Sequence, residues 1–296
     1  MEVDRDTHIG DYAALQSLTE VGLGSFLHAL HIPFAGHFLS INQAVLLTFA
    51  CKKTDSTKTA IKTSLAISNI AALLKSLSPM GKRLTPMLAI SAQGFLYSLG
   101  FVLGRNILGV SLGIFLLSIW GFVQPLLLAY FIFGEKLFLA IEKLWMDLSN
   151  LLSIDQTYGI WILVSVVLIK IVVGILIGIY VWRSKSEFET RYLNKIRNIK
   201  VITPNKKKQN PFIGALKDSL SPWVLVSLTL SVSFMWVSEG STYFELWLYS
   251  LRAFALAWLF FWGLRSYPMS WAKQLLYKYP AAKRAIDQVF NFKSRK

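Results

Sequence analysis

Eight long apolar segments dominate this chain of 296 residues and limit what it can fold into. A helix needs about 20 mostly apolar residues to cross the hydrocarbon core of a bilayer. The clearest of these segments are Ile107–Phe133 and residues 159–182 and 244–264. Hydrophobic residues make up 54% of the chain, more than an ordinary soluble protein of this length contains. The sequence therefore predicts an all-α, polytopic membrane protein.

The predicted spans divide the chain into four parts. The eight spans are placed at residues 13–30, 34–50, 59–77, 86–103, 107–133, 159–182, 222–237 and 244–264. The resulting parts are a six-helix membrane bundle (1–183), a basic cytoplasmic linker (184–218), a transmembrane helical pair (219–266) and a basic cytoplasmic tail at the membrane interface (267–296). Either a solvated linker or a helix lying on anionic lipid fits the basic stretch between bundle and pair.

The distribution of lysine and arginine predicts the orientation of the spans. The net charge is +15, and the basic residues concentrate in residues 183–218, in residues 265–296 and between the second and third spans. Basic loops stay in the cytoplasm, and these three segments share one side only if both termini are cytoplasmic. Lys82 and Arg83 are exceptions to this rule, because they lie on a connection that this arrangement places outside. We expect an integral protein of a bacterial cytoplasmic membrane, with anionic lipid at its basic segments.

The outer connection between the first two spans carries irregular, polar sequence. Pro33 and Gly36 interrupt helical structure there, and such backbone is tolerated at membrane depth only where protein buries it or it lines a cavity. With His31 they are interpreted as a gate, and His37 as a substrate contact, while interfacial packing stays an alternative. His28 lies close by, but no neighbouring acid or cysteine completes a ligand set, so no metal site is predicted.

Three amides lie in otherwise apolar spans: Asn42, Gln93 and Gln124. Each must find hydrogen-bond partners inside the bundle or in a cavity. Together with Trp120 they suit a neutral or weakly charged, partly aromatic small molecule. Hydrogen bonding from helix to helix is the alternative explanation for each amide taken singly.

Two spans carry a basic residue, Lys170 in the sixth and Arg252 in the eighth. A charge in the middle of a span is costly, so we expect Lys170 to have a partner or a polar cavity, with Glu20 as a possible counter-ion. Residues 136–152 predict an amphipathic helix lying flat outside the bundle, either as a lid over a pocket or as a plain connection.

The segment Ile32-Pro33-Phe34-Ala35-Gly36-His37, the polar start of the second span and the glycine-rich fourth and fifth spans resemble a known family. They are similar to the substrate-binding subunit (S component) of energy-coupling factor vitamin transporters, over about residues 12–183. The resemblance implies a six-helix bundle that captures a vitamin near its outer face and associates with a membrane coupling protein and two ATPases. The family's docking face of small residues would correspond to Ala13, Ser17, Gly22 and Gly24, and the last two spans lie outside its usual plan.

Three functions follow as hypotheses. The first is a subunit that binds a small micronutrient and imports it with a separate ATPase module. The second is a non-transporting membrane scaffold or assembly factor, and the third is a membrane-embedded enzyme acting on lipid through the histidine group. The chain has no Gly-x-x-x-x-Gly-Lys-Ser/Thr, His-Glu-x-x-His or Gly-x-Ser-x-Gly motif. No enzymatic activity, no cofactor and no nucleic-acid partner are therefore expected.

Overall fold

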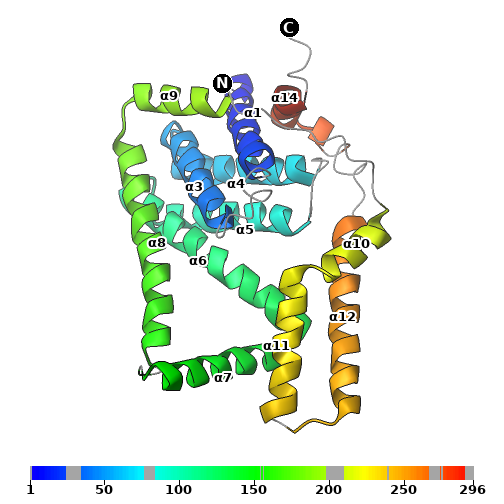
Figure 1. Ribbon diagram of the computed structural model, residues 1–296. Coiled ribbons are helices and arrows are strands. Elements are labelled where there is room, and N and C mark those ends of the chain that lie inside the picture. Colours follow the sequence, from blue (N-terminus) through cyan, green and yellow to red (C-terminus); the bar gives the residue numbers. More distant parts are fainter. Residues whose placement is uncertain are drawn as a thin grey trace. The chain divides into compact units, whose positions relative to one another are not determined.

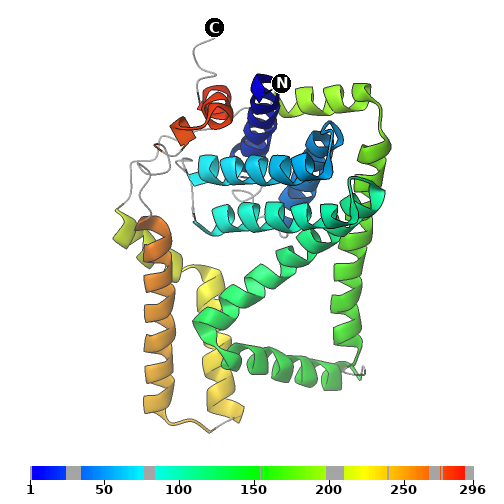
Figure 2. The same cartoon turned by 180° about the vertical axis from the view of Figure 1, so that it is seen from behind.

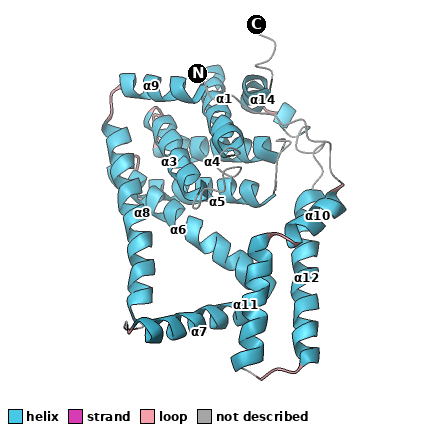
Figure 3. Cartoon of the chain, in the orientation of Figure 1, coloured by secondary structure: helices cyan, strands magenta, loops and turns pink. Residues whose placement is uncertain are grey.

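A computed structural model of the chain describes residues 2–24, 35–76, 84–153, 155, 157–197, 210–238, 240–266, 274 and 276–290. Within these residues every regular element is a helix (Figure 3), so the all-α prediction is confirmed for this part of the chain. The elements are α1 (Glu2–Leu18), the π-helix η1 (Thr19–Leu23), α3 (Ala35–Lys52), α4 (Thr57–Ser76), α5 (Leu84–Gly100), the 3-10 helix η2 (Phe101–Leu103), α6 (Ile107–Phe133), α7 (Glu135–Leu152), α8 (Thr157–Arg183), α9 (Ser186–Arg197), α10 (Pro211–Ser219), α11 (Pro222–Ser238), α12 (Tyr243–Ser266) and α14 (Pro280–Phe290).

Four helical segments are long and apolar enough to cross a membrane: Thr85–Leu103, Ile107–Phe133, Thr157–Arg183 and Tyr243–Gly263. A fifth crossing results if the bent pair of α10 and α11 counts as one span. The described residues thus contain several helices that are long and apolar enough for membrane spans, as the sequence predicted. The count of six plus two spans is not confirmed.

The first three predicted spans coincide with helices that are more polar than a lone membrane span. α3 and α4 lie at the second and third predicted spans, and α1 and η1 contain residues 13–23 of the first, whose last six residues lie outside the described part of the chain. α4 carries Lys58, Lys62 and Lys75, and α1 begins with several charged residues. Such helices depend on neighbouring helices to cover their polar groups.

The chain forms two compact units, and each is assembled from separate stretches of sequence. Unit 1 comprises Met1–Gly121, Ile169–Lys206 and Pro268–Lys296, and unit 2 comprises Phe122–Leu168 and Lys207–Tyr267. The long helices α6 and α8 each contribute one part to unit 1 and the other to unit 2. This division differs from the sequential parts expected from the sequence.

Unit 1 contains α1, α3, α4, α5 and the adjoining parts of α6 and α8, with α9 and α14 added. Figures 1 and 2 show α4 and α5 lying side by side. Glycines bring the helices close: a Cβ on Gly100 of α5 would lie 2.3 Å from the backbone oxygen of Gly109 on α6, and one on Gly94 would lie 2.1 Å from Ser68 of α4. Phe49, Tyr97 and other large side chains are fully buried and form the core of this unit.

Hydrogen bonds from two tyrosine hydroxyls hold the short helix α9 against other helices of unit 1. The Tyr12 hydroxyl donates to the Glu189 carboxylate, which also lies 2.6 Å from Lys53 Nζ. The Tyr192 hydroxyl donates to Asn42 Oδ1. Burial, followed by the bond to Glu189, raises the pKa of Tyr12, and burial raises the pKa of Tyr192 to about 12. Both phenols therefore stay protonated donors near neutral pH.

The C-terminal helix α14 packs against α1 within unit 1. Its Ala282 and Ala285 are fully buried. Asp11 of α1 accepts hydrogen bonds from Arg284 Nε at 2.7 Å and from Gln288 Nε2 at 2.7 Å. The end of the chain, expected at the membrane interface, thus also covers a helix of the bundle.

Unit 2 is built from α7, α10, α11, α12 and the adjoining parts of α6 and α8. α7 packs against α11 and runs crosswise to it in Figure 1, and α10 packs against α12. Arg265 Nε lies 2.8 Å from Asp218 Oδ2, and the Tyr249 hydroxyl donates to the Phe133 carbonyl at 2.9 Å. The predicted amphipathic helix at residues 136–152 is present as α7.

Candidate ligand-binding site

The first turns of α3 carry His37 at the position that follows the predicted outer gate. His31 and Pro33, the other gate residues, lie outside the described residues, as does His28. Gly36 is exposed, and a Cβ there would meet nothing within 4 Å. The backbone at Gly36 therefore has open space, whereas the next residue, His37, is half-buried.

Lys170 brings α8 into contact with α6 and α3. Its Nζ donates to the backbone carbonyl of Ser118 at 3.1 Å. A Cβ on Gly121 would lie 2.6 Å from Lys170 Nζ and 3.2 Å from His37 Nδ1. The missing side chain of Gly121 thus provides the space in which an ammonium group and an imidazole lie next to each other.

Trp120 precedes Gly121 on α6 and adds a hydrogen-bond donor. Its indole Nε1 is buried and meets no acceptor within the part of the chain that the structure describes. A buried N–H of this kind usually has a partner. We refer to His37, Ser118, Trp120, Gly121 and Lys170 as the Lys170 cluster.

Asn42 and Gln93, the two predicted site amides that lie in unit 1, have different surroundings. Asn42 is engaged in packing: its Nδ2 donates to Thr19 Oγ1 at 2.9 Å, and its Oδ1 accepts from Tyr192. Gln93 is buried on α5, next to the close approach of Gly94 to α4. The bonding of Asn42 is the helix-to-helix alternative that the sequence had left open.

Gln124, the remaining amide, belongs to unit 2 and is half-buried on α6. Trp120 and His37 belong to unit 1, and Gly121, the residue that follows Trp120, lies next to His37 and Lys170. The sequence prediction included both residues but treated Lys170 only as a charge that needs compensation.

Gln43 was not among the predicted site residues, although it is the most deeply buried amide of α3. Its Nε2 donates to the Ile90 carbonyl at 3.0 Å, and its Oε1 has no hydrogen-bond partner among the described residues. Its place directly after Asn42 in the polar start of α3 was the available signal. This hydrogen bond to the Ile90 carbonyl joins α3 to α5.

Glu20 lies beside Lys75 and not at Lys170. Lys75 of α4 donates to the backbone carbonyl of Glu20, and both side chains are buried. The predicted role of Glu20 as counter-ion of Lys170 is therefore wrong. Arg252, the other charge in a predicted span, is exposed on α12.

The predicted docking residues of the first helix are covered by this chain. Ala13 and Ser17 are fully buried, and Ser17 Oγ donates to the Ala13 carbonyl at 2.7 Å. A Cβ on Gly24 would lie 3.1 Å from Leu39, and Gly22 is half-buried. A separate coupling protein would reach Ala13 and Ser17 only after helices of unit 1 had moved.

Within the described ranges, no three or more His, Cys, Asp and Glu side chains are grouped so that they could hold a metal ion. Cys51 is buried, and its thiol donates to the Ala60 carbonyl at 3.5 Å.

Comparisons with models of protein families, with curated proteins and with solved structures find no match to the chain. The Lys170 cluster is therefore judged on its own chemistry.

Proposed function

We propose that the chain is a membrane subunit that binds a small micronutrient, a vitamin or vitamin precursor, and imports it together with a separate ATPase module. The binding site would lie near the outer face of unit 1. The protein would reside in a bacterial cytoplasmic membrane with both termini in the cytoplasm, as the basic segments indicate. The observation that supports this best is the Lys170 cluster.

The cluster favours a ligand with an anionic group. Lys170 lies on one of the helices that are apolar enough to span a membrane, where an ionisable side chain is costly and indicates a functional site by default. A carboxylate on the ligand would accept hydrogen bonds from Lys170 Nζ and from the Trp120 indole N–H. The Trp120 ring offers an apolar face to the remainder of the molecule.

An external energy source is part of this proposal. The chain lacks the phosphate-binding loop in which backbone N–H groups and a lysine hold ATP phosphates. Uptake against a gradient would then draw on a separate energy source, and the resemblance to transporter S components implies that this source is an ATPase partner.

A non-transporting scaffold or assembly factor is the second candidate. It is favoured by the covered docking face, since Ala13 and Ser17 are buried and α14 packs on α1. The large exposed side chains of unit 2, such as Trp236 and Trp247, offer contacts to lipid or to another membrane protein. In this case the Lys170 cluster would join helices and bind no ligand.

Native mass spectrometry of the full chain, extracted gently from its own membranes, separates the two candidates. We expect a stoichiometric small anion and ATPase subunits with the wild-type protein. Lys170→Met should abolish retention of the anion, and Trp120→Phe should weaken it. Lys217→Met serves as the matched control, because Lys217 is exposed on α10 of unit 2.

An empty wild-type protein with other protein partners would overturn the transport proposal and favour the scaffold. Retention of the same anion by Lys170→Met would show that the ligand binds elsewhere. Thermal unfolding of each variant shows whether the fold is intact.

A further inference from the structure

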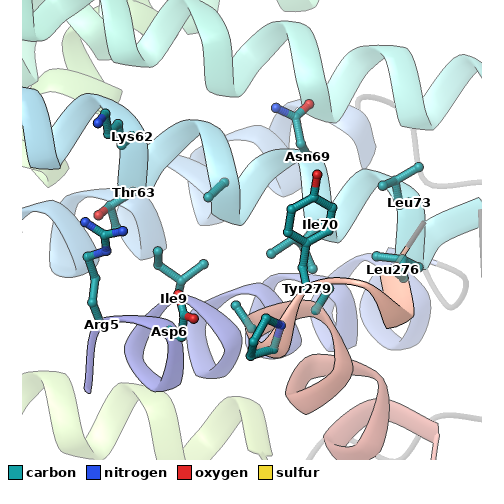
Figure 4. A pocket seen from close by; sticks show the side chains of 14 residues that line it. Arg5, Asp6, Ile9, Lys62, Thr63, Asn69, Ile70, Leu73, Leu276 and Tyr279 are labelled. Atoms are coloured by element: carbon teal, nitrogen blue, oxygen red, sulfur yellow. The ribbon is translucent and has the colours of Figure 1, made fainter. Parts of the chain in front are cut away.

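A cavity in unit 1 lies between α1, α4 and the segment that leads into α14 (Figure 4). Its volume is about 370 Å³, which falls within the range of small-molecule sites, roughly 300–1,000 Å³. None of its lining residues belongs to the Lys170 cluster. The cavity is therefore independent of the site proposed above.

The cavity has an apolar body. Its walls are formed by Ile9 of α1, Ala66 and Ile70 of α4, and Leu276 and Ala281 near the C-terminus. Surfaces of this kind bind hydrocarbon, because every apolar group that leaves water contributes to binding. An apolar lining does not by itself distinguish a flexible chain from a ring, so the polar groups decide the class of ligand.

One end of the cavity is cationic. Arg5 and Lys62 lie at the same end in Figure 4, where Asp6 is the single carboxylate among the lining residues. Arg5 and Lys62 are exposed and Asp6 is half-buried. The basic side chains outnumber the carboxylate, so this end favours an anion.

Thr63 supplies an unused hydrogen-bonding group at the cationic end. Helical Ser and Thr side chains commonly bond to the carbonyl one turn earlier, as Ser17 and Thr48 do here at 2.7 Å. Thr63 is 1% exposed and lines the cavity, and its Oγ1 has no hydrogen-bond partner among the described residues. Its hydroxyl is available to a polar group that enters the cavity.

We propose that this cavity binds the acyl chain of an anionic amphiphile, with the headgroup at Arg5 and Lys62. The ligand has one chain in the apolar body and a carboxylate or phosphate at the cationic end. It comes either from the pool of free fatty acids or from an anionic membrane phospholipid. Because residues near the C-terminus form one wall, an occupied cavity would hold that segment against α1 and α4.

The test uses the purified full chain and laurate as the probe, with dodecyltrimethylammonium as a cation of equal chain length. We expect laurate to bind with one molecule per chain and the cation not to bind. Decanoate should bind about tenfold more weakly than laurate, because it buries two fewer methylene groups. Equal binding of laurate and dodecyltrimethylammonium would overturn the proposal.

Variants locate the binding. The double variant Arg5→Gln/Lys62→Gln should weaken laurate binding at least tenfold. Lys58→Gln should leave it unchanged, because Lys58 is exposed on α4 one turn from Lys62 and does not line the cavity. Ala66→Leu should block the apolar body. If Ala66→Leu fails to fold, the exposed charge variants decide, and no effect of the double variant would contradict the proposal.

Nanodiscs distinguish the two sources. Retention of phosphatidylglycerol over phosphatidylcholine of the same chains identifies a membrane phospholipid as the ligand. Retention of laurate alone identifies a free fatty acid. If neither is retained by the wild-type protein, the cavity is not an amphiphile site. Retention of the Lys170 ligand in the same samples is read separately, so the two proposals can fail independently.

Discussion

The two units of this chain treat polar side chains differently. Unit 1 buries glutamines, two glutamates and a lysine, and some of them connect its helices: Gln43 joins α3 to α5, and Glu189 joins α9 to α1. In unit 2 the buried polar side chains among the described residues are only those of Ser149, Ser219 and Ser231. Each of these serines bonds to a backbone carbonyl of its own helix.

The difference indicates what each unit can do. Polar groups held in place by neighbouring helices can recognise a ligand, because they are already positioned and partly desolvated. A unit with few such groups and a largely apolar exterior is suited to lipid or to another apolar surface. Both sites proposed here, the Lys170 cluster and the cavity at Thr63, accordingly lie in unit 1.

The largest expected effect tests how tightly the helices of unit 1 approach. In Gly100→Ala the new methyl group would lie 2.3 Å from the backbone of α6. Such overlap with backbone costs more than about 3 kcal/mol of unfolding free energy. Thermal unfolding in detergent measures it.

Gly263→Ala is the control in unit 2, since a Cβ on this glycine of α12 meets nothing within 4 Å. It should leave stability unchanged or raise it by up to about 1 kcal/mol, because alanine favours helix over glycine. Equal destabilisation by the two substitutions would contradict the close approach of α5 and α6 at Gly100.

Glu189→Ala tests the polar connections. It leaves the buried Tyr12 hydroxyl without its acceptor, which costs about 1–3 kcal/mol. Asp218→Ala in unit 2 removes an ion pair with Arg265 that is partly open to water, and the expected cost is about 1 kcal/mol or less. Denaturant unfolding followed by circular dichroism compares the two, and a larger cost for Asp218→Ala would contradict the comparison.

The smallest effect concerns single tyrosine hydroxyls. Tyr192→Phe and Tyr249→Phe each remove one hydrogen bond and should cost about 1 kcal/mol. The pKa of Tyr192 is raised to about 12, above its usual value near 10. The stabilisation by Tyr192 should therefore be fully present below pH 10 and disappear as the pH rises through 12.

Stability measured from pH 6 to pH 10 checks this expectation. The difference between the wild-type protein and Tyr192→Phe should stay constant over that range. A difference that already declines below pH 9 would show that the Tyr192 hydroxyl is not buried as described.

The sequence predicted the strongly apolar helices well. The predicted span at Ile107–Phe133 coincides with α6, because a long run without charge has few alternatives to a helix in lipid. It also predicted the amphipathic helix α7. Contacts between distant segments were out of reach: the apolar face around Ala282 and Ala285 is visible in the sequence, but nothing there shows that α1 covers it.

The same limit applied to the candidate site. His37 and Trp120 were named from their residue types and positions, and Lys170 was recognised as a costly charge. That Lys170 lies beside His37 depends on how α8 packs against α6 and α3, and Gly121 makes room for it only in the folded unit. Glu20 was assigned to the wrong lysine for the same reason, since Lys75 approaches it from α4.

Whether unit 1 holds a ligand at Lys170 is tested most directly by a cryo-electron microscopy map of the full chain, extracted into nanodiscs from its own membranes. We predict density for a small non-protein molecule within hydrogen-bonding distance of Lys170 Nζ and Trp120 Nε1, which is lost in the map of Lys170→Met. Side chains alone filling the space around Lys170 in the wild-type map would contradict the ligand site and leave the cluster as a contact between helices.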